Sequence, residues 1–198
     1  MTDLDATFKL NTRGFPVIAV GVSNLWRQFH LVCILLVSDL KQTQWEHAIR
    51  SMLDMYVTVT DEQVHISYVM MDADTAQRSD FESITVQCLD VESQPKYMMC
   101  FFHVMKNVKK RITYLSESKK RIGFRHIYRI HYARDGVEKK QCTKEAIADW
   151  NKDCDLKEFG SYFLEQWLTG RFWQRVETPM GMAKTNSPVE NFNGQFKQ

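Results

Sequence analysis

Three acidic residues that lie far apart in the sequence, Asp5, Asp72 and Glu190, have the side chains needed to bind divalent metal ions. Two hard cations about 4 Å apart need several carboxylate oxygens, and two Asp with one Glu form a sufficient minimum set. Spacing alone does not assemble such a site, because soluble domains carry many surface acids. The elements that contain these residues must bring them together.

Asp72 has the most informative position of the three. It directly follows the apolar run Tyr68-Val-Met-Met71, and α/β sheets present functional groups at the carboxyl ends of their strands. The alternative interpretation is that Asp72 or Asp74 caps a helix that begins near Ala76. The sequence leaves both interpretations open.

The first part of the chain predicts three sequential strands. Apolar and polar residues alternate over residues 4–10, which places Asp5 on the polar face of a strand. A turn cluster at residues 11–14 and an apolar run at 15–22 predict an antiparallel hairpin. Residues 29–38 are apolar on both sides, which predicts a central third strand.

A helix and a fourth strand follow. Trp45, Ile49 and Leu53 recur at helical spacing, and residues 65–71 form an apolar run that predicts a strand. A strand, a crossover helix and another strand imply parallel pairing with an earlier strand. If that partner is the first strand, Asp72 lies beside Asp5. This order of elements resembles the ribonuclease H-like fold.

The remaining elements complete an α/β fold. We expect a helix over about 76–86, a fifth strand over 96–102 and a basic amphipathic helix over 103–112. Beyond it the chain is mostly helical, with a short strand at 126–132. The prediction is a single domain, 1–198, with a mixed five-stranded sheet flanked by helices. A mostly helical insertion of about 104–185 precedes Glu190.

The composition fits one substantial core, since the chain has 198 residues and is 44% hydrophobic. The sequence contains neither a run of about 18 apolar residues nor a signal-peptide pattern. The five cysteines are scattered and odd in number, which favours a reducing compartment. We therefore expect a soluble intracellular protein without a membrane partner.

Positive charge is concentrated in residues 106–140. This stretch has twelve Lys or Arg and three acids, a net charge of +9, so the rest of the chain carries −7 of the overall +2. Such asymmetry is typical of a nucleic-acid backbone surface, although a solvated helix face is the alternative. The candidate DNA contacts are Lys106, Lys109, Lys110, Arg111, Lys119, Lys120, Arg121 and Arg125.

Four aromatic residues of the helical region have two interpretations. Spaced among Leu and Phe residues, they are typical of a helical core, and stacking on bases is the alternative. The four are Trp150, Trp167, Phe172 and Trp173.

Four short motifs resemble those of Mutator-like element (MULE) transposases, of the DDE superfamily. Asp5-Ala-Thr-Phe-Lys-Leu, Tyr68-Val-Met-Met-Asp-Ala-Asp-Thr-Ala and Thr185-Asn-Ser-Pro-Val-Glu-Asn-Phe-Asn193 are similar to the three acidic motifs. Cys100-Phe-Phe-His103 is similar to the family's Cys-x-x-His element. The motifs occur in the family's order and span essentially the whole chain.

The resemblance implies an enzyme that cleaves DNA strands at transposon ends and transfers them to a target. Asp5, Asp72 and Glu190 occupy the catalytic positions and would hold two Mg²⁺ or Mn²⁺ ions, whereas Asp74 matches an acidic position that is not a ligand. The partners would be transposon and target DNA, with homo-oligomerisation in the active state. Nuclear residence follows from that substrate.

Cys100 and His103 could supply half of a zinc site, which His126 and His131 or the later cysteines would complete. The alternative is that Cys100 packs in the core while His103 orients the polynucleotide or caps the basic helix.

The chain departs from a complete transposase in length. Only four residues precede Asp5, eight follow Glu190, and the family's upstream DNA-binding region is absent. These features favour a fragment or a decayed element. One alternative function is a domesticated, catalytically inactive protein that binds DNA as a regulator, and another is a general ribonuclease H-like nuclease. A simple nuclease would cut DNA without joining it.

Overall fold

The computed structural model describes residues 1–7, 12–73, 75–89 and 94–196, without the side chains of residues 75–77, 80 and 196. The chain divides into two compact units. One comprises Met1–Met98 with Gly181–Gln198, and the other comprises Met99–Met180. Within the described ranges, no helix is long and apolar enough to cross a membrane.

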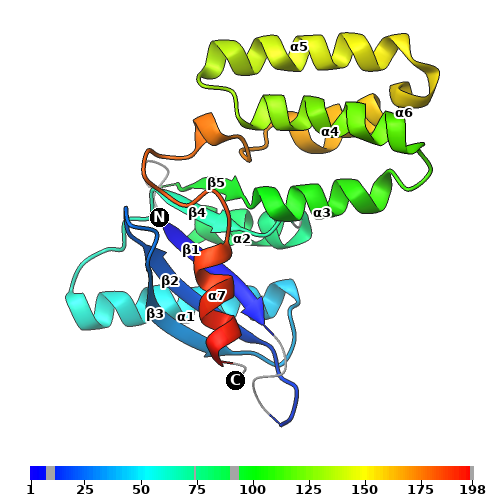
Figure 1. Ribbon diagram of the computed structural model, residues 1–198. Helices are drawn as coiled ribbons and strands as arrows, with labels where there is room; N and C mark the ends of the chain where they lie inside the picture. Colours follow the sequence, from blue (N-terminus) through cyan, green and yellow to red (C-terminus); the bar gives the residue numbers. More distant parts are fainter. Residues whose placement is uncertain (8–11, 74, 90–93, 197–198) are drawn as a thin grey trace. The chain divides into compact units, whose positions relative to one another are not determined.

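The first unit is built on a five-stranded mixed sheet with the strand order β3-β2-β1-β4-β5 (Figure 1). Its first three strands form an antiparallel meander, and β4 pairs in parallel with β1. Both features were predicted from the sequence. The strands are β1 (Thr2–Thr7), β2 (Val17–Ser23), β3 (Phe29–Leu36), β4 (Tyr68–Met71) and β5 (Lys96–Met99). The predicted fifth strand is therefore shorter than expected.

Helices α1 (Gln42–Thr60) and α2 (Thr75–Cys88) pack on one face of this sheet. The side chains that alternate toward this face are apolar, as the period of two in a strand requires. They are buried together with the apolar stripes of the two helices. This core contains Leu4, Ile18, Val20, Val69, Met71, Trp45, Ile49, Leu53, Phe81 and Ile84.

Helix α7 (Ser187–Phe196) lies on the opposite face of the sheet, where Figure 1 shows it crossing in front of the first strands. The rings of Phe192 on α7 and Phe29 on β3 have centroids 5.0 Å apart. This face carries the polar residues of β1, so the C-terminal helix covers the strand from which Asp5 projects.

The prediction that the third strand is central was wrong, because β3 lies at an edge of the sheet. Cys33 and Leu35 pack against the core, whereas Val32 and Leu36 are 54% and 62% exposed. An uninterrupted apolar run is typical of a strand covered on both faces. Here the covering helices leave part of the strand in contact with water, which the local sequence does not reveal.

The second unit is mostly helical, with α3 (Phe101–Arg111), α4 (Glu117–His131), α5 (Gly136–Lys152) and α6 (Cys154–Phe163). Two short helical segments follow, η2 (Leu164–Leu168) and η3 (Arg175–Glu177). The predicted strand at 126–132 was wrong, because these residues belong to α4 and its C-cap. The alternation of apolar and polar residues there also fits a helix. Ile127, Ile130 and His131 all fall on the buried face of α4.

The tryptophans of the second unit form its core, as the first of the two interpretations had it. Trp150, Trp167 and Trp173 are each at most 2% exposed. Trp150 packs edge-on against the rings of Phe159 and Phe163, with centroids 5.0 and 5.6 Å away. These three tryptophans therefore present no ring face to a base.

Candidate functional site

Asp5 lies on β1, on the face of the sheet that α7 covers. Its neighbours in the strand, Leu4 and Ala6, point to the apolar core on the other face. The carboxylate of Asp5 is half-buried, and its Oδ2 accepts a hydrogen bond of 2.6 Å from Nδ2 of Asn193 on α7.

Asp72 follows the last residue of β4, and the parallel register places it next to Asp5. Thr2 pairs with Val69 and Asp3 pairs with Met70. If this register continued past the end of β4 by two residues, it would set Asp72 opposite Asp5, at about the 4.8 Å spacing of neighbouring strands. The sequence-based expectation that these two residues are adjacent agrees with this register.

Asn186 connects both strands to the start of α7. Its Nδ2 donates to the backbone oxygen of Leu4 at 3.0 Å and to Oδ1 of Asp72 at 3.3 Å. Asn186 is fully buried. One amide group therefore fixes the strand of Asp5, the carboxylate of Asp72 and the entry to the C-terminal helix.

Glu190 lies on the same side of α7 as the two asparagines. Asn186, Glu190 and Asn193 are spaced i, i+4 and i+7, which places them on one helical face. The backbone N–H of Glu190 donates to the backbone oxygen of Asn186 at 3.0 Å. This is the i to i+4 hydrogen bond of an α-helix, so Asn186 shares the helical spacing of α7. Because the outer two side chains contact Asp72 and Asp5, half-buried Glu190 is on the face of α7 that meets the sheet.

Sequence reasoning did not single out the two asparagines. Their signal was present in Thr185-Asn-Ser-Pro-Val-Glu-Asn-Phe-Asn193, where Asn186 and Asn193 flank Glu190 at helical spacing. Asp74 lies outside the described residues.

Asp3 is a further acid on this face that the sequence reasoning missed. It is two residues from Asp5 in β1, and its side chain is fully buried. The hydroxyl of Ser23 on β2 donates to Asp3 Oδ2, while Oδ1 has no hydrogen-bond partner among the described residues. Burial away from water raises the pKa of Asp3 from 3.8 to about 6, and the Ser23 hydrogen bond opposes this rise.

Cys100 and His103 lie one helical turn apart at the start of α3. Cys100 is fully buried, His103 is half-buried, and the Cys100 sulfur lies within 4.8 Å of a ring nitrogen of His103. Their predicted partners make other contacts. His131 stacks on Phe101 at 3.6 Å, and His126 lies 3.5 Å from Asp149.

Within the described parts of the chain, neither His126 nor His131 joins a metal-ligand group with Cys100 and His103. Burial lowers the pKa of His126, with a smaller opposing effect from Asp149. Zinc binding stays a prediction.

The predicted DNA contacts fall into two groups. Three of them make ion pairs, which reduces their availability to phosphates: Lys119 with Asp153, Lys120 with Glu117 and Arg111 with Glu158. The other five are exposed and make no ion pair with any residue that the structure describes. They are Lys106, Lys109 and Lys110 on α3 and Arg121 and Arg125 on α4.

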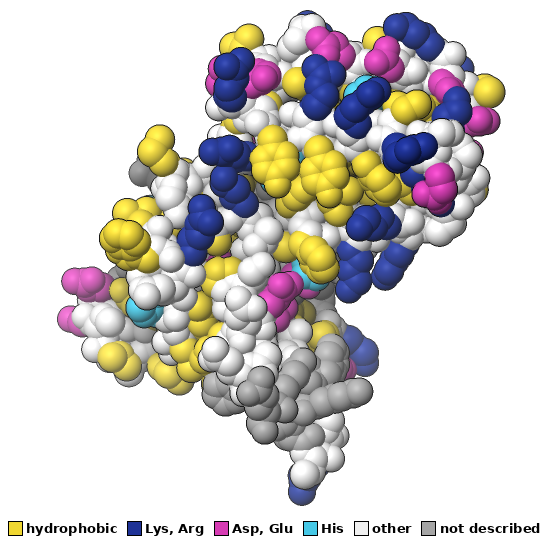
Figure 2. Space-filling model, in the orientation of Figure 1, with side chains coloured by type: hydrophobic (Ala, Val, Ile, Leu, Met, Phe, Trp, Pro, Cys, Tyr) yellow, Lys and Arg dark blue, Asp and Glu magenta, His cyan; other side chains and the backbone are white. Residues whose placement is uncertain are grey.

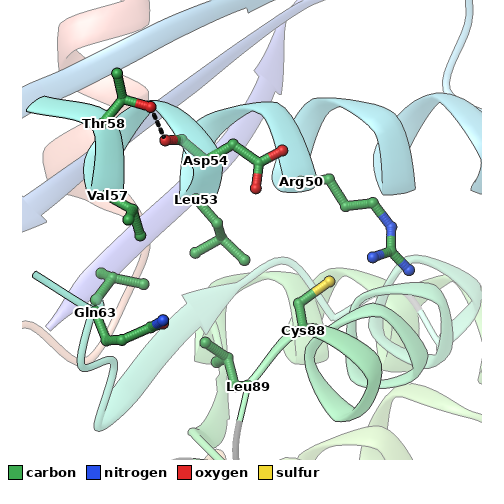
Figure 3. Close-up of a pocket in the computed structure, with 9 residues that line it drawn as sticks. Arg50, Leu53, Asp54, Val57, Thr58, Gln63, Cys88 and Leu89 are labelled. Atoms are coloured by element: carbon green, nitrogen blue, oxygen red, sulfur yellow. Dashed lines mark hydrogen bonds between the residues drawn. The ribbon is translucent and has the colours of Figure 1, made fainter. Parts of the chain in front are cut away.

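A pocket of about 480 Å³ lies apart from the carboxylates, on the α1 and α2 side of the first unit. Figure 3 shows Leu53 and Val57 of α1 on one wall and Cys88 and Leu89 on the other. Arg50 at its rim is bound to Glu46 and Gln87. Its position across the sheet from Asp5 gives it no part in chemistry at the carboxylates.

A sequence model of the MULE transposase domain matches residues 1–107, which is more than half of the chain. The matched segment contains Asp5 and Asp72 and ends before Glu190. A comparison with curated proteins found no match.

Proposed function

The chain belongs to the MULE transposase domain family, and from this premise we propose that it cleaves and transfers DNA strands at transposon ends. Divalent metal ions would be held by Asp5, Asp72 and Glu190. The observation that carries the proposal is the junction of α7 with β1 and β4, where Asn193 contacts Asp5 and Asn186 contacts Asp72.

The topology supports a ribonuclease H-like core. An antiparallel meander is followed by a helix and by a strand parallel to β1. The two aspartates then lie at neighbouring strands, and the helical residues 99–180 separate them in sequence from Glu190. We propose that this helical segment is an insertion into the core.

The donor set fits Mg²⁺ or Mn²⁺. Three carboxylates offer hard oxygen ligands, which these ions prefer over nitrogen and sulfur. The ions would supply Lewis acidity toward a phosphodiester oxygen.

The residues of the chain itself prepare the site before any ion binds. Asn193 fixes the rotamer of Asp5 through its Oδ2, and Asn186 fixes Asp72 through its Oδ1. Such hydrogen bonds to ligating carboxylates orient them and raise metal affinity. Glu190 completes the set from the same helical face. The unpaired basic side chains of α3 and α4 would hold the DNA backbone without reading sequence.

The proposal is tested by Mn²⁺ titration calorimetry on the parent chain and on an Asp5→Asn, Asp72→Asn double variant. Asp54→Asn is the matched control, since Asp54 is an exposed acid on α1 of the same unit. Saturable binding by the parent and the control, lost in the double variant, is expected. Equal binding by all three chains would overturn the proposed metal site.

A second assay addresses the reaction. The parent chain with Mn²⁺ should join a 3′-hydroxyl end to a second DNA, whereas a simple nuclease would only cut. A non-cutting DNA-binding protein is the second candidate, which the unpaired basic residues favour because they need no metal. It predicts salt-sensitive DNA binding that persists in the double variant without cutting or joining.

A further inference from the structure

The exposed face of α4 combines two arginines with two tyrosines. Successive helical residues are rotated by about 100°, so Arg121, Arg125, Tyr128 and Tyr132 fall within an arc of about 60°. All four side chains are exposed, Tyr128 by 43% and Tyr132 by 54%. We call this set the α4 stripe.

The two tyrosine rings are already parallel. Their centroids are 6.2 Å apart and their planes differ by 9°. Phe101 meets both of them edge-on, at 5.6 Å from Tyr128 and 6.4 Å from Tyr132. Phe101 is itself stacked on His131 at 3.6 Å. A buried aromatic layer therefore supports the exposed rings and limits their rotation, which lowers the entropy lost on binding.

The charge of the stripe is only partly balanced by its neighbours, since Arg121 interacts with Glu117 and Arg125 with Asp149 without forming an ion pair. Arg129, which lies outside the stripe, pairs with Glu145 at 2.7 Å. Arg121 and Arg125 make no ion pair with any described residue. A ligand that has both flat apolar faces and negative charge would fit exposed aromatic rings beside arginines that form no ion pair. Nucleic acid has both properties. Figure 2 shows a group of hydrophobic side chains on the helical unit, with Lys and Arg and some Asp and Glu around it.

We propose that the α4 stripe binds unpaired DNA bases, with Tyr128 and Tyr132 stacking on the bases and Arg121 and Arg125 contacting the phosphates. The identity of the ligand as DNA rests on the proposed function. Bases inside a duplex are covered on both faces by their neighbours, so only an unpaired base has a free face.

The experiment measures binding of the full chain to a fluorescent oligothymidine of about 12 nucleotides and to a duplex of equal length. A chelator is present, so that metal binding and cleavage do not contribute. The Tyr128→Ala, Tyr132→Ala variant should bind the single strand about tenfold more weakly or worse. Its affinity for the duplex should change by less than about twofold, because the arginines are intact.

Two control variants separate stacking from other effects. Tyr128→Phe, Tyr132→Phe keeps both rings and should retain single-strand affinity within about twofold. Tyr114→Ala removes a tyrosine that is 52% exposed but lies outside the stripe, and it should bind like the parent.

Three results would overturn the inference. These are no binding of the single strand by the parent, parent-like binding by the double alanine variant, or an equal loss in the phenylalanine variant. None of them bears on the calorimetric test of Asp5 and Asp72, which needs no DNA. Failure of the stripe and failure of the metal site are therefore distinguishable.

Discussion

Replacing Asp3 with Asn should change how the stability of the protein depends on pH. The folded pKa of Asp3, about 6, lies above its unfolded value of 3.8. At a pH below both values, the Asp3 carboxyl is protonated in the folded and in the unfolded state, so it does not lower the free energy of unfolding. As the pH rises through this window, the unfolded state ionises first, so the free energy of unfolding falls until the pH exceeds the folded pKa. The Asp3→Asn variant has no ionisable group at this position, so its free energy of unfolding does not fall for this reason.

The magnitude follows from the two pKa values of Asp3. At about 1.36 kcal/mol per pKa unit, the full loss is roughly 3 kcal/mol. About 2 kcal/mol of this loss in the free energy of unfolding occurs between about pH 4.5 and about pH 7.5. The relevant quantity is the stability of the parent minus that of Asp3→Asn, because titrations of other groups cancel in this difference.

The assay is urea unfolding of both chains over this pH range, with a chelator present to remove any metal bound near Asp5. The difference in free energy should decrease by about 2 kcal/mol as the pH rises. Asp54→Asn, which removes an exposed acid, controls for the change in net charge. A constant offset between parent and Asp3→Asn has no bearing on the result. If the two stability profiles run parallel at all pH values, the raised pKa of Asp3 is refuted.

Three further substitutions give separate outcomes. Asn193→Ala removes the donor to Asp5 and should weaken Mn²⁺ binding by about 10- to 100-fold in calorimetry, so an unchanged Kd contradicts the orienting role. Gly21→Ala would place a Cβ 2.5 Å from the His30 carbonyl oxygen; thermal unfolding should show a loss of about 1–3 kcal/mol, and an unaltered Tm argues against this packing. Trp150→Ala empties a fully buried position and should cost about 3–5 kcal/mol in urea unfolding; a loss below about 1 kcal/mol would show that the indole is not in the core.

The sheet could be predicted where apolar and polar residues alternate and where the order of strands and helices restricts the pairing. The alternation around Asp5 gave the face of β1, and the helix before β4 implied the parallel pairing with β1. The edge position of β3 was not predictable, because it depends on which faces the helices cover. The prediction of a strand at 126–132 was wrong because the apolar residues there fit both the strand period and the helix period. The burial of Ile127 and Ile130 on one face agrees with the helix.

The site shows the same division. Asp72 could be placed beside Asp5 from strand order alone. The roles of Asn186 and Asn193 depend on where α7 docks, which no local pattern contains. Asp3 was visible as a polar residue on the face of Asp5, but its complete burial depends on residues distant in sequence, among them Ser23 on β2. The α4 stripe was not predicted from the sequence, because the tryptophans were the more evident candidates for stacking on bases. The structure places those tryptophans in the core.

The hydrogen bond from Asn186 to Leu4 joins residues 182 positions apart. During synthesis β1 is translated before α7, and the whole segment between Leu4 and Asn186 is made in the interval. At about 5–20 residues per second, roughly 10–40 s separate the two. Throughout that interval the polar face of β1 lacks its covering helix, and the cluster around Asp5 and Asp72 has neither asparagine. Closure by α7 therefore follows synthesis of the helical residues 99–180, and a nascent chain would stay without the assembled cluster until residues 186–193 have been made.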